Sequence, residues 1–207
     1  MALHTLAELA GYLGSALGVA MVVPQIVRTY RFRSMAGVSA MSWALTALSC
    51  CTWLLYGVRT GELPQIPGNV LLVGGAVVVV LAVPSAATPT ARAARLAAGG
   101  LALALAAAVL PAVVLGLIGF ALGVVSGLPQ LARSLRRSSA VSAVSPLTWA
   151  LRVASQACWL SYALVLHDVV VAVSASVLVT SALVVLAAET LRPPVPEPAT
   201  SVAVLAG

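Results

Sequence analysis

The sequence predicts an all-α membrane protein with seven spanning helices. Three observations support this: an apolar composition, the spacing of charge-free windows, and the placement of the arginines. Of the 207 residues, 61% are hydrophobic and 8% are charged, whereas soluble domains carry about 25% charged residues. Such a chain cannot build a water-exposed surface, so lipid is its main solvent. The net charge of +6 comes without basic runs between aromatic residues, which argues against a nucleic-acid partner.

Apolar windows of about 20 residues, the length needed to cross a bilayer, predict the helices in order. Residues 96–130 are uncharged throughout, which is too long for one crossing at about 1.5 Å per residue. Pro111 therefore divides this window into a short fourth helix and a fifth helix. The tail, 190–207, is proline-rich and is predicted to be disordered. The seven predicted spans cover residues 9–27, 34–58, 63–84, 93–110, 112–133, 144–166 and 169–188.

The arginines predict the orientation of these spans. The loops after the first, third and fifth spans hold eight arginines, and the other loops hold only Arg59. Because cytoplasmic loops are enriched in basic residues, the N-terminus is predicted outside and the C-terminus in the cytoplasm. The start of the chain lacks the positive region of a signal peptide and should stay as the first membrane helix. The eight loop arginines are Arg28, Arg31, Arg33, Arg92, Arg95, Arg133, Arg136 and Arg137.

The chain also contains an internal repeat with an offset of roughly 105 residues. "PQ" at 24–25 matches "PQ" at 129–130, "VSAMSWAL" matches "VSPLTWAL", and "WLLYG" matches "WLSYA". Each unit holds three helices, and the fourth helix reverses the chain so that both units face the same way. The predicted organisation is a first triple-helix bundle at 1–84, a loop and linker helix at 85–111, and a second bundle at 112–189.

Two Pro-Gln pairs in register, each followed by a basic loop, a "VS…W" helix start and a Trp-x-x-Tyr element, resemble the PQ-loop family. The most similar members are the SWEET and SemiSWEET sugar transporters, over residues 8–188. The resemblance implies a facilitative carrier with a central pocket between two three-helix bundles, working by alternating access. A proline breaks the hydrogen-bond ladder of a helix, so hinges are predicted there, with static kinks as the alternative. The predicted hinge residues are Pro24, Gln25, Pro129 and Gln130.

Helical spacing places several candidate binding residues on shared faces. On the second helix, Thr46, Cys50 and Trp53 lie at i, i+4 and i+7 and therefore share one face. Aromatic faces suit the apolar side of a sugar ring, and a few polar groups suit its hydroxyls. Generic packing or interface anchoring is the alternative for the tryptophans. The equivalent positions on the sixth helix are Arg152, Gln156 and Trp159.

Trp53 and Asn69, sixteen residues apart, resemble the sugar-binding pair of the SWEET family. An amide carries donors and an acceptor, which suits hydroxyl recognition; hydrogen bonding between helices is the alternative. The second unit departs from this pattern, because Ala175 follows Trp159 at the same distance, flanked by two serines. This difference puts the identity of the sugar in doubt. The candidate substrate-binding residues are Trp53, Asn69, Trp159, Gln156, Ser174, Ser176, Cys50 and Arg152.

Arg152 is the only charged residue well inside a predicted span. A charge at the centre of a membrane helix costs about 2.5–3.5 kcal/mol on insertion scales, so such residues face the bundle or a wet cavity. Two interpretations stay open at this point. Arg152 contacts a substrate carboxylate, phosphate or neutral acceptor, or it snorkels to the cytoplasmic interface beside Trp149.

Other function classes have no supporting motif. The sequence offers no catalytic triad, no nucleotide-binding loop and no cysteine–histidine cluster, so neither an enzyme nor a metal or other cofactor is predicted. Cys50, Cys51 and Cys158 are interpreted as small buried hydrophobes. The predicted membrane interior holds no carboxylate of the kind that carries protons in coupled transporters. This absence favours uniport.

The sequence therefore predicts a passive, bidirectional uniporter for a mono- or disaccharide, embedded in a lipid bilayer. Alternatives are a carrier for another small metabolite, such as an amino acid or a vitamin-like compound, and a non-transporting receptor. One chain can enclose the pathway, and a homo-oligomer stays an open alternative. Exclusive use of arginine and a high alanine content are associated with GC-rich bacterial genomes, which predicts a bacterial plasma membrane.

Overall fold

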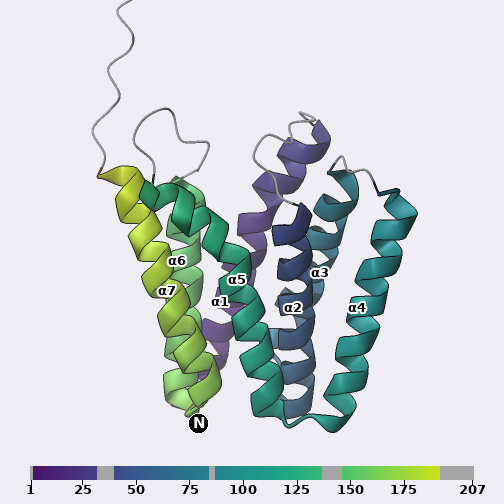
Figure 1. Ribbon diagram of the computed structural model, residues 1–207. Coiled ribbons are helices and arrows are strands. Elements are labelled where there is room, and N and C mark those ends of the chain that lie inside the picture. The colour runs from purple at the N-terminus through teal and green to yellow at the C-terminus, as the bar shows by residue number, and fades with distance from the viewer. Residues whose placement is uncertain (1, 32–39, 84–86, 137–145, 192–207) are drawn as a thin grey trace, which may run out of the picture.

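The computed structural model describes residues 2–31, 40–83, 87–136 and 146–191 (Figure 1). These residues form seven helices and no strands, which confirms the all-α fold. The fourth helix begins at Pro89, ahead of the predicted start, because Thr88 caps it by accepting a hydrogen bond from the Ala91 N–H. Residues 192–207 of the predicted tail lie outside this description. The helices are α1 Ala2–Arg31, α2 Ala40–Thr60, α3 Gln65–Ala82, α4 Pro89–Val109, α5 Ala112–Arg136, α6 Pro146–Leu166 and α7 Val169–Thr190.

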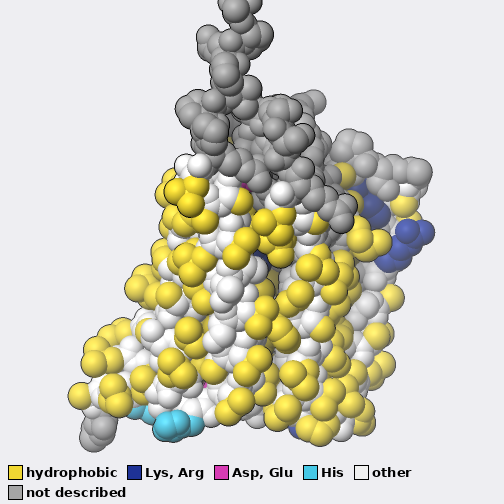
Figure 2. All heavy atoms as spheres, turned by 60° about the vertical axis from the view of Figure 1, so that its left-hand side comes forward, with side chains coloured by type: hydrophobic (Ala, Val, Ile, Leu, Met, Phe, Trp, Pro, Cys, Tyr) yellow, Lys and Arg dark blue, Asp and Glu magenta, His cyan; other side chains and the backbone are white. Residues whose placement is uncertain are grey.

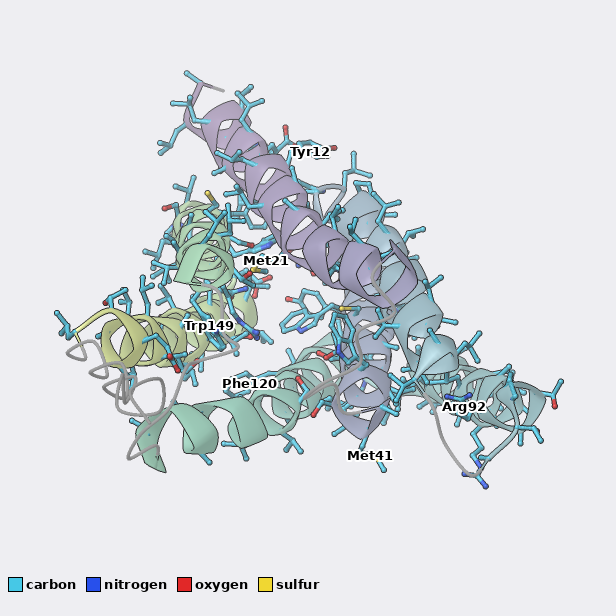
Figure 3. The ribbon with its side chains drawn as sticks, turned by 90° about the horizontal axis from the view of Figure 1, so that it is seen from above. Tyr12, Met21, Met41, Arg92, Phe120 and Trp149 are labelled. Atoms are coloured by element: carbon cyan, nitrogen blue, oxygen red, sulfur yellow. The ribbon has the colours of Figure 1, made fainter. Side chains whose placement is uncertain are left out.

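Six of the described helices form a ring, and α4 lies outside it (Figure 3). Around the ring each helix packs on the next in the order α1, α3, α2, α5, α7 and α6. Helices α1–α3 form one bundle and α5–α7 the other, with the third helix of each bundle between the first two. The bundles meet where α1 packs on α6 and α2 packs on α5. Helices α1 and α5 both rise from the lower to the upper end of Figure 1, so the two repeats are parallel, as predicted.

The outer surface of the ring is apolar. Figure 2 shows hydrophobic side chains over most of the surface between the two ends, with histidines at the lower end. By length and composition, α1 to Val23, α2, α3, α4 and α7 are each sufficient to cross a membrane. The described apolar part of α5, Ala112–Leu128, is shorter, and α6 carries Arg152 and Gln156 near its middle. A bilayer is the solvent that suits such a surface.

Two arginines hold α4 against the first bundle. Arg92 donates from Nη1 to the carbonyl oxygens of Val80, at 2.7 Å, and Val83, at the end of α3. Arg59 donates to the carbonyl oxygen of Ala107, near the end of α4. The last carbonyls of a helix have no partner within the helix and carry partial negative charge, so guanidinium donors stabilise both ends of the linker. Helix α4 is therefore fixed to α2 and α3 on the outside of the first bundle.

Small residues allow α1 and α3 to approach closely. The Ser15 hydroxyl of α1 donates to the carbonyl oxygen of Pro64 at 2.6 Å. A Cβ added at Gly68 of α3 would lie 2.5 Å from Ser15 Oγ and 2.7 Å from Ser15 Cβ. Glycine at this position lets the two backbones pack in contact, which is how membrane helices associate without a hydrophobic driving force between them.

We expect the Gly68→Ala variant to be about 1–3 kcal/mol less stable, the usual cost of overpacking a close contact. Gly74→Ala, on the same helix, is the matched control, because no atom lies within 4 Å of the added Cβ. Thermal unfolding in detergent micelles, followed by circular dichroism, measures both variants. Equal melting temperatures for the two alanine variants would contradict the tight α1–α3 contact.

Candidate functional site

A cavity of about 730 Å³ lies inside the ring and is lined by residues of α1, α2, α3, α5, α6 and α7. Seen from above, Met21 and Trp149 point toward it, while Tyr12 and Met41 point away (Figure 3). Its wall reaches the first turns of α2 and α6 at the upper end. This volume is within the range of about 300–1,000 Å³ typical of small-molecule sites. The lining includes seven of the predicted residues: Cys50, Trp53, Asn69, Arg152, Gln156, Trp159 and Ser174.

Ser176 does not join the other predicted residues. Its side chain is exposed on the outside of α7 and donates to the carbonyl oxygen of Ala172 at 2.8 Å. Two residues along a helix turn the side chain by about 200°, so Ser174 and Ser176 cannot share a face, and including Ser176 was wrong. The side chains of Pro24, Gln25, Pro129 and Gln130 lie outside the description, although helix α1 continues past the first pair and α5 past the second.

Each tryptophan of the repeat packs against a glycine of the opposite bundle. A Cβ added at Gly119 of α5 would lie 3.1 Å from Trp53 Nε1, and one added at Gly14 of α1 would lie 3.1 Å from Trp159 Nε1. The two positions are equivalent in the internal repeat. The indoles therefore form the cavity wall along the lines where the bundles meet, and glycine is needed opposite each of them.

Two serines that the sequence analysis did not single out form hydrogen bonds between the bundles along the same two lines of contact. Ser49 donates to the carbonyl oxygen of Gly119 at 2.7 Å, and Ser155 donates to that of Gly14 at 2.8 Å. Both serines are buried and both line the cavity. The signal was present in the sequence, because these serines precede Trp53 and Trp159 by the same four residues. What the repeat alone cannot give is the partner of each serine, which lies in the other bundle.

The two halves of the cavity differ in their polar groups. Asn69 is buried on α3, lines the cavity and donates from Nδ2 to the carbonyl oxygen of Gln65 at 2.8 Å. Its equivalent on α7 is Ala175, which also lines the cavity. Cys50 on α2 and Gln156 on α6 occupy equivalent positions in the internal repeat. The cavity is thus pseudo-symmetric in shape and asymmetric in hydrogen-bonding capacity.

Arg152 lines the upper part of the cavity, where its guanidinium carbon lies 5.4 Å from the centre of the Trp149 ring. Arg152 therefore lines the cavity, as the substrate-contact interpretation expects, and also lies beside Trp149, as the snorkelling interpretation expects. Among the described residues that line the cavity, no other carries a formal charge. Its equivalent on α2 is Thr46, whose hydroxyl donates to its own helix at the Ser42 carbonyl oxygen, 2.9 Å away.

Below the tryptophans the two bundles touch and close the lower end. Tyr56 donates from its hydroxyl to Asp168 Oδ2 at 2.7 Å. The equivalent Tyr162 lies close enough to Glu62 for the two side chains to interact. Each tyrosine packs edge-on against the tryptophan above it, with centroids 5.4 Å apart in both halves. These tyrosine–carboxylate pairs join the second helix of one unit to the turn before the third helix of the other, so closure depends on contacts between bundles. Residue Ala163 is fully buried among them.

Glu62 lies in the turn between α2 and α3, outside the membrane-spanning segments. Burial, followed by the neighbouring Asp168 carboxylate, raises the pKa of Glu62 from 4.5 to about 7. Gln65 donates from Nε2 to Glu62 Oε2 at 2.7 Å, which offsets part of this effect. Because ionised Glu62 is disfavoured in this arrangement, the closed lower end is most stable when Glu62 is protonated. That stability declines as the pH rises from about 4.5 through 7.

We expect the lower end to open more readily at pH 8 than at pH 6. In a protein whose three native cysteines are replaced by alanine, Ala163→Cys reports opening through its rate of modification by a membrane-impermeant maleimide. The rate is divided by that of Val169→Cys, an exposed position at the same end, which removes the reagent's own pH dependence. The normalised rate should rise several-fold from pH 6 to pH 8.

Two further variants identify the titrating group. Glu62→Gln should flatten the pH response, because it removes the second carboxylate beside Asp168. His167→Asn, which preserves a residue suited to the left-handed backbone at φ 58°, should leave the response unchanged. A response that survives Glu62→Gln, or that disappears with His167→Asn, would show that Glu62 is not responsible.

Comparison with known proteins agrees with this architecture. A family model described as "PQ loop repeat" matches residues 6–66 and again residues 111–171, one match in each bundle. Among solved structures, the chain is similar to that of a eukaryotic SWEET transporter at 3.7 Å resolution. The TM-score is 0.75 at 17% sequence identity, with 91% of this chain and 97% of that chain covered. No curated protein sequence matches the chain. The two matches confirm the resemblance inferred from the paired Pro-Gln units.

Proposed function

The chain belongs to the PQ-loop repeat family, and from that premise we propose that it is a passive, bidirectional membrane carrier for a small sugar, working by alternating access. One observation carries the proposal. A cavity of substrate size lies between two parallel three-helix bundles, reaches the first turns of α2 and α6 at the upper end, and is closed below by contacts between the bundles. Separation of the bundles at the lower end would expose the same cavity on the other side.

In this mechanism the bundles tilt about the middle of the ring. The serine–glycine hydrogen bonds and the tryptophan–glycine contacts lie at mid-height on both lines of contact, so they act as the pivot. Opening the lower end breaks the hydrogen bond from Tyr56 to Asp168 and separates the equivalent pair, Tyr162 and Glu62. The backbone hydrogen bonds that Pro24 and Pro129 cannot donate would make α1 and α5 easier to bend at these points. We propose that the lower end faces outside and the upper end the cytoplasm, in a plasma membrane of bacterial type.

In the proposed binding mode the sugar sits between the two indoles. Trp53 and Trp159 would stack on its apolar faces, while Asn69, Gln156 and Ser174 would hydrogen-bond its hydroxyls. Cys50 would complete the wall on α2. A receptor that binds without transporting is the alternative within the same family, and uptake into vesicles separates the two.

Purified protein in liposomes should transport labelled glucose or sucrose down a gradient and should exchange it across the membrane without an ion gradient. Trp53→Ala and Trp159→Ala should each lower uptake at least tenfold, a loss of about 1.4 kcal/mol or more in substrate interaction. Tyr12→Ala is the matched aromatic control, because Tyr12 is 43% exposed on the outer face. Binding without uptake, measured by tryptophan fluorescence, would favour a receptor.

Replacing Pro24 and Pro129 by alanine together should slow exchange several-fold while leaving substrate affinity unchanged, because a continuous hydrogen-bond ladder stiffens α1 and α5. Pro111→Ala, in the turn before α5, is the control and should exchange at the normal rate. The measurement is the half-time of sugar counterflow in liposomes, with affinity taken from equilibrium binding. An unchanged half-time for the double variant would show that these prolines are static kinks.

A further inference from the structure

Arg152 brings a positive charge into the cavity that no acidic side chain among the described residues offsets. It lies six residues into α6, and its described neighbour is the face of Trp149, 5.4 Å from the guanidinium carbon. A cation over an aromatic face gains about 0.5–2 kcal/mol, which is small beside the cost of removing a guanidinium from water. The position therefore favours an anion in the cavity.

No carboxylate of the described chain pairs with this guanidinium. Glu8 lies 3.8 Å from His4 Nδ1 near the start of α1, Glu62 and Asp168 lie in the closed lower end, and Glu189 lies in the last turn of α7. None of them lines the cavity. A buried or half-buried charge is normally paired, so the missing counter-charge is available to a ligand.

Building on the proposed function, we propose that the transported sugar is a sugar acid, a polyhydroxylated monocarboxylate whose carboxylate binds Arg152 while its hydroxyls lie along Gln156 and between the two indoles. The guanidinium presents a planar fork of donors that matches a carboxylate with two parallel hydrogen bonds. Neutral sugars then bind the same cavity more weakly, because they leave the charge of Arg152 without a partner.

The spacing along α6 fits this class of ligand. Arg152, Gln156 and Trp159 follow one another at single-turn intervals on the same face, each step about 5–6 Å. A carboxylate on Arg152 therefore places the adjacent hydroxyl-bearing carbons beside the Gln156 amide and the remainder against the Trp159 indole. The equivalent face of α2 carries Thr46, Cys50 and Trp53, none of which is charged. The carboxylate of the ligand therefore has one binding position, at Arg152 on α6.

The single charge also selects between acids. One guanidinium neutralises one negative charge, and the equivalent position, Thr46, adds none. A phosphate carries about −1.5 to −2 charges at pH 7 and would leave excess charge in a cavity that holds no other cation among its described lining residues. A carboxylate leaves no such excess, so a sugar acid is favoured over a sugar phosphate.

The test compares labelled gluconate, glucuronate, glucose 6-phosphate and glucose in liposomes containing the full chain. Because a uniporter that carries a monoanion moves net charge, an inside-positive diffusion potential should raise gluconate or glucuronate accumulation and leave glucose unaffected. Arg152→Thr, which installs the residue of the equivalent position, should lower uptake of the anions at least tenfold and keep or raise that of glucose. Arg152→Lys should retain part of the anion uptake. Arg95→Gln, which removes an exposed charge outside the cavity, is the control.

Each outcome separates this inference from the proposed function. Glucose uptake without uptake of either sugar acid, or anion uptake that Arg152→Thr leaves unchanged, overturns the inference and leaves the carrier in place. Preference for glucose 6-phosphate overturns the monocarboxylate assignment. If nothing is transported, binding of gluconate is measured instead, by quenching of tryptophan fluorescence. Quenching that Arg152→Thr abolishes would support the anion site while overturning the carrier function. An absence of quenching would overturn both the anion site and the carrier function. Glucose uptake or an unchanged melting temperature shows that Arg152→Thr is folded.

Discussion

The structure depends on the close approach of the second helix of each unit to the first helix of the other. At both lines of contact a glycine, Gly14 or Gly119, lies directly against an indole and accepts a serine hydrogen bond through its carbonyl oxygen. In lipid, helices gain nothing by hiding apolar surface from one another, so packing and hydrogen bonds must hold them together. These two contacts close six helices into a ring, and the cavity exists because they occur at mid-height.

At the lower end the contacts between the two units are of a different kind: tyrosine side chains of one unit meet carboxylates of the other. The tyrosine–carboxylate pairs are few, polar and located at the end of the bundle, where water competes for their hydrogen bonds once the bundles separate. The mid-height contacts are buried, and their serine hydroxyls would have no water to bond to in lipid if the bundles separated there. In the proposed mechanism, this difference in the cost of breaking the two sets of contacts would let the lower end open while the middle stays intact, as alternating access requires.

Sequence reasoning reached the helices, the repeat and most of the cavity wall for a clear physical reason. Apolar windows and helical period act locally, so the shared face of Thr46, Cys50 and Trp53 follows from spacing alone, as does its partner on α6. Contacts between units do not follow from spacing, and the links from Ser49 to Gly119 and from Tyr56 to Asp168 therefore required the structure. The error at Ser176 came from counting neighbours along the chain where helical geometry sends them to opposite sides.

The equivalent positions of the two units divide into two groups with different physical roles. Positions that hold the bundles together carry the same or similar residues in both halves: serine with serine, glycine with glycine, tryptophan with tryptophan, and glutamate with aspartate. Several positions that line the cavity differ, as Thr46 and Arg152 or Asn69 and Ala175 do, although Trp43 and Trp149 are the same residue in both halves. A ring closed by two equivalent contacts needs them to be of similar strength, whereas a fully symmetric cavity would hold a small ligand in two opposite orientations. One charge on α6 and one amide on α3 remove that degeneracy, so the proposed ligand, with its acidic end and hydroxylated body, would have a single preferred orientation.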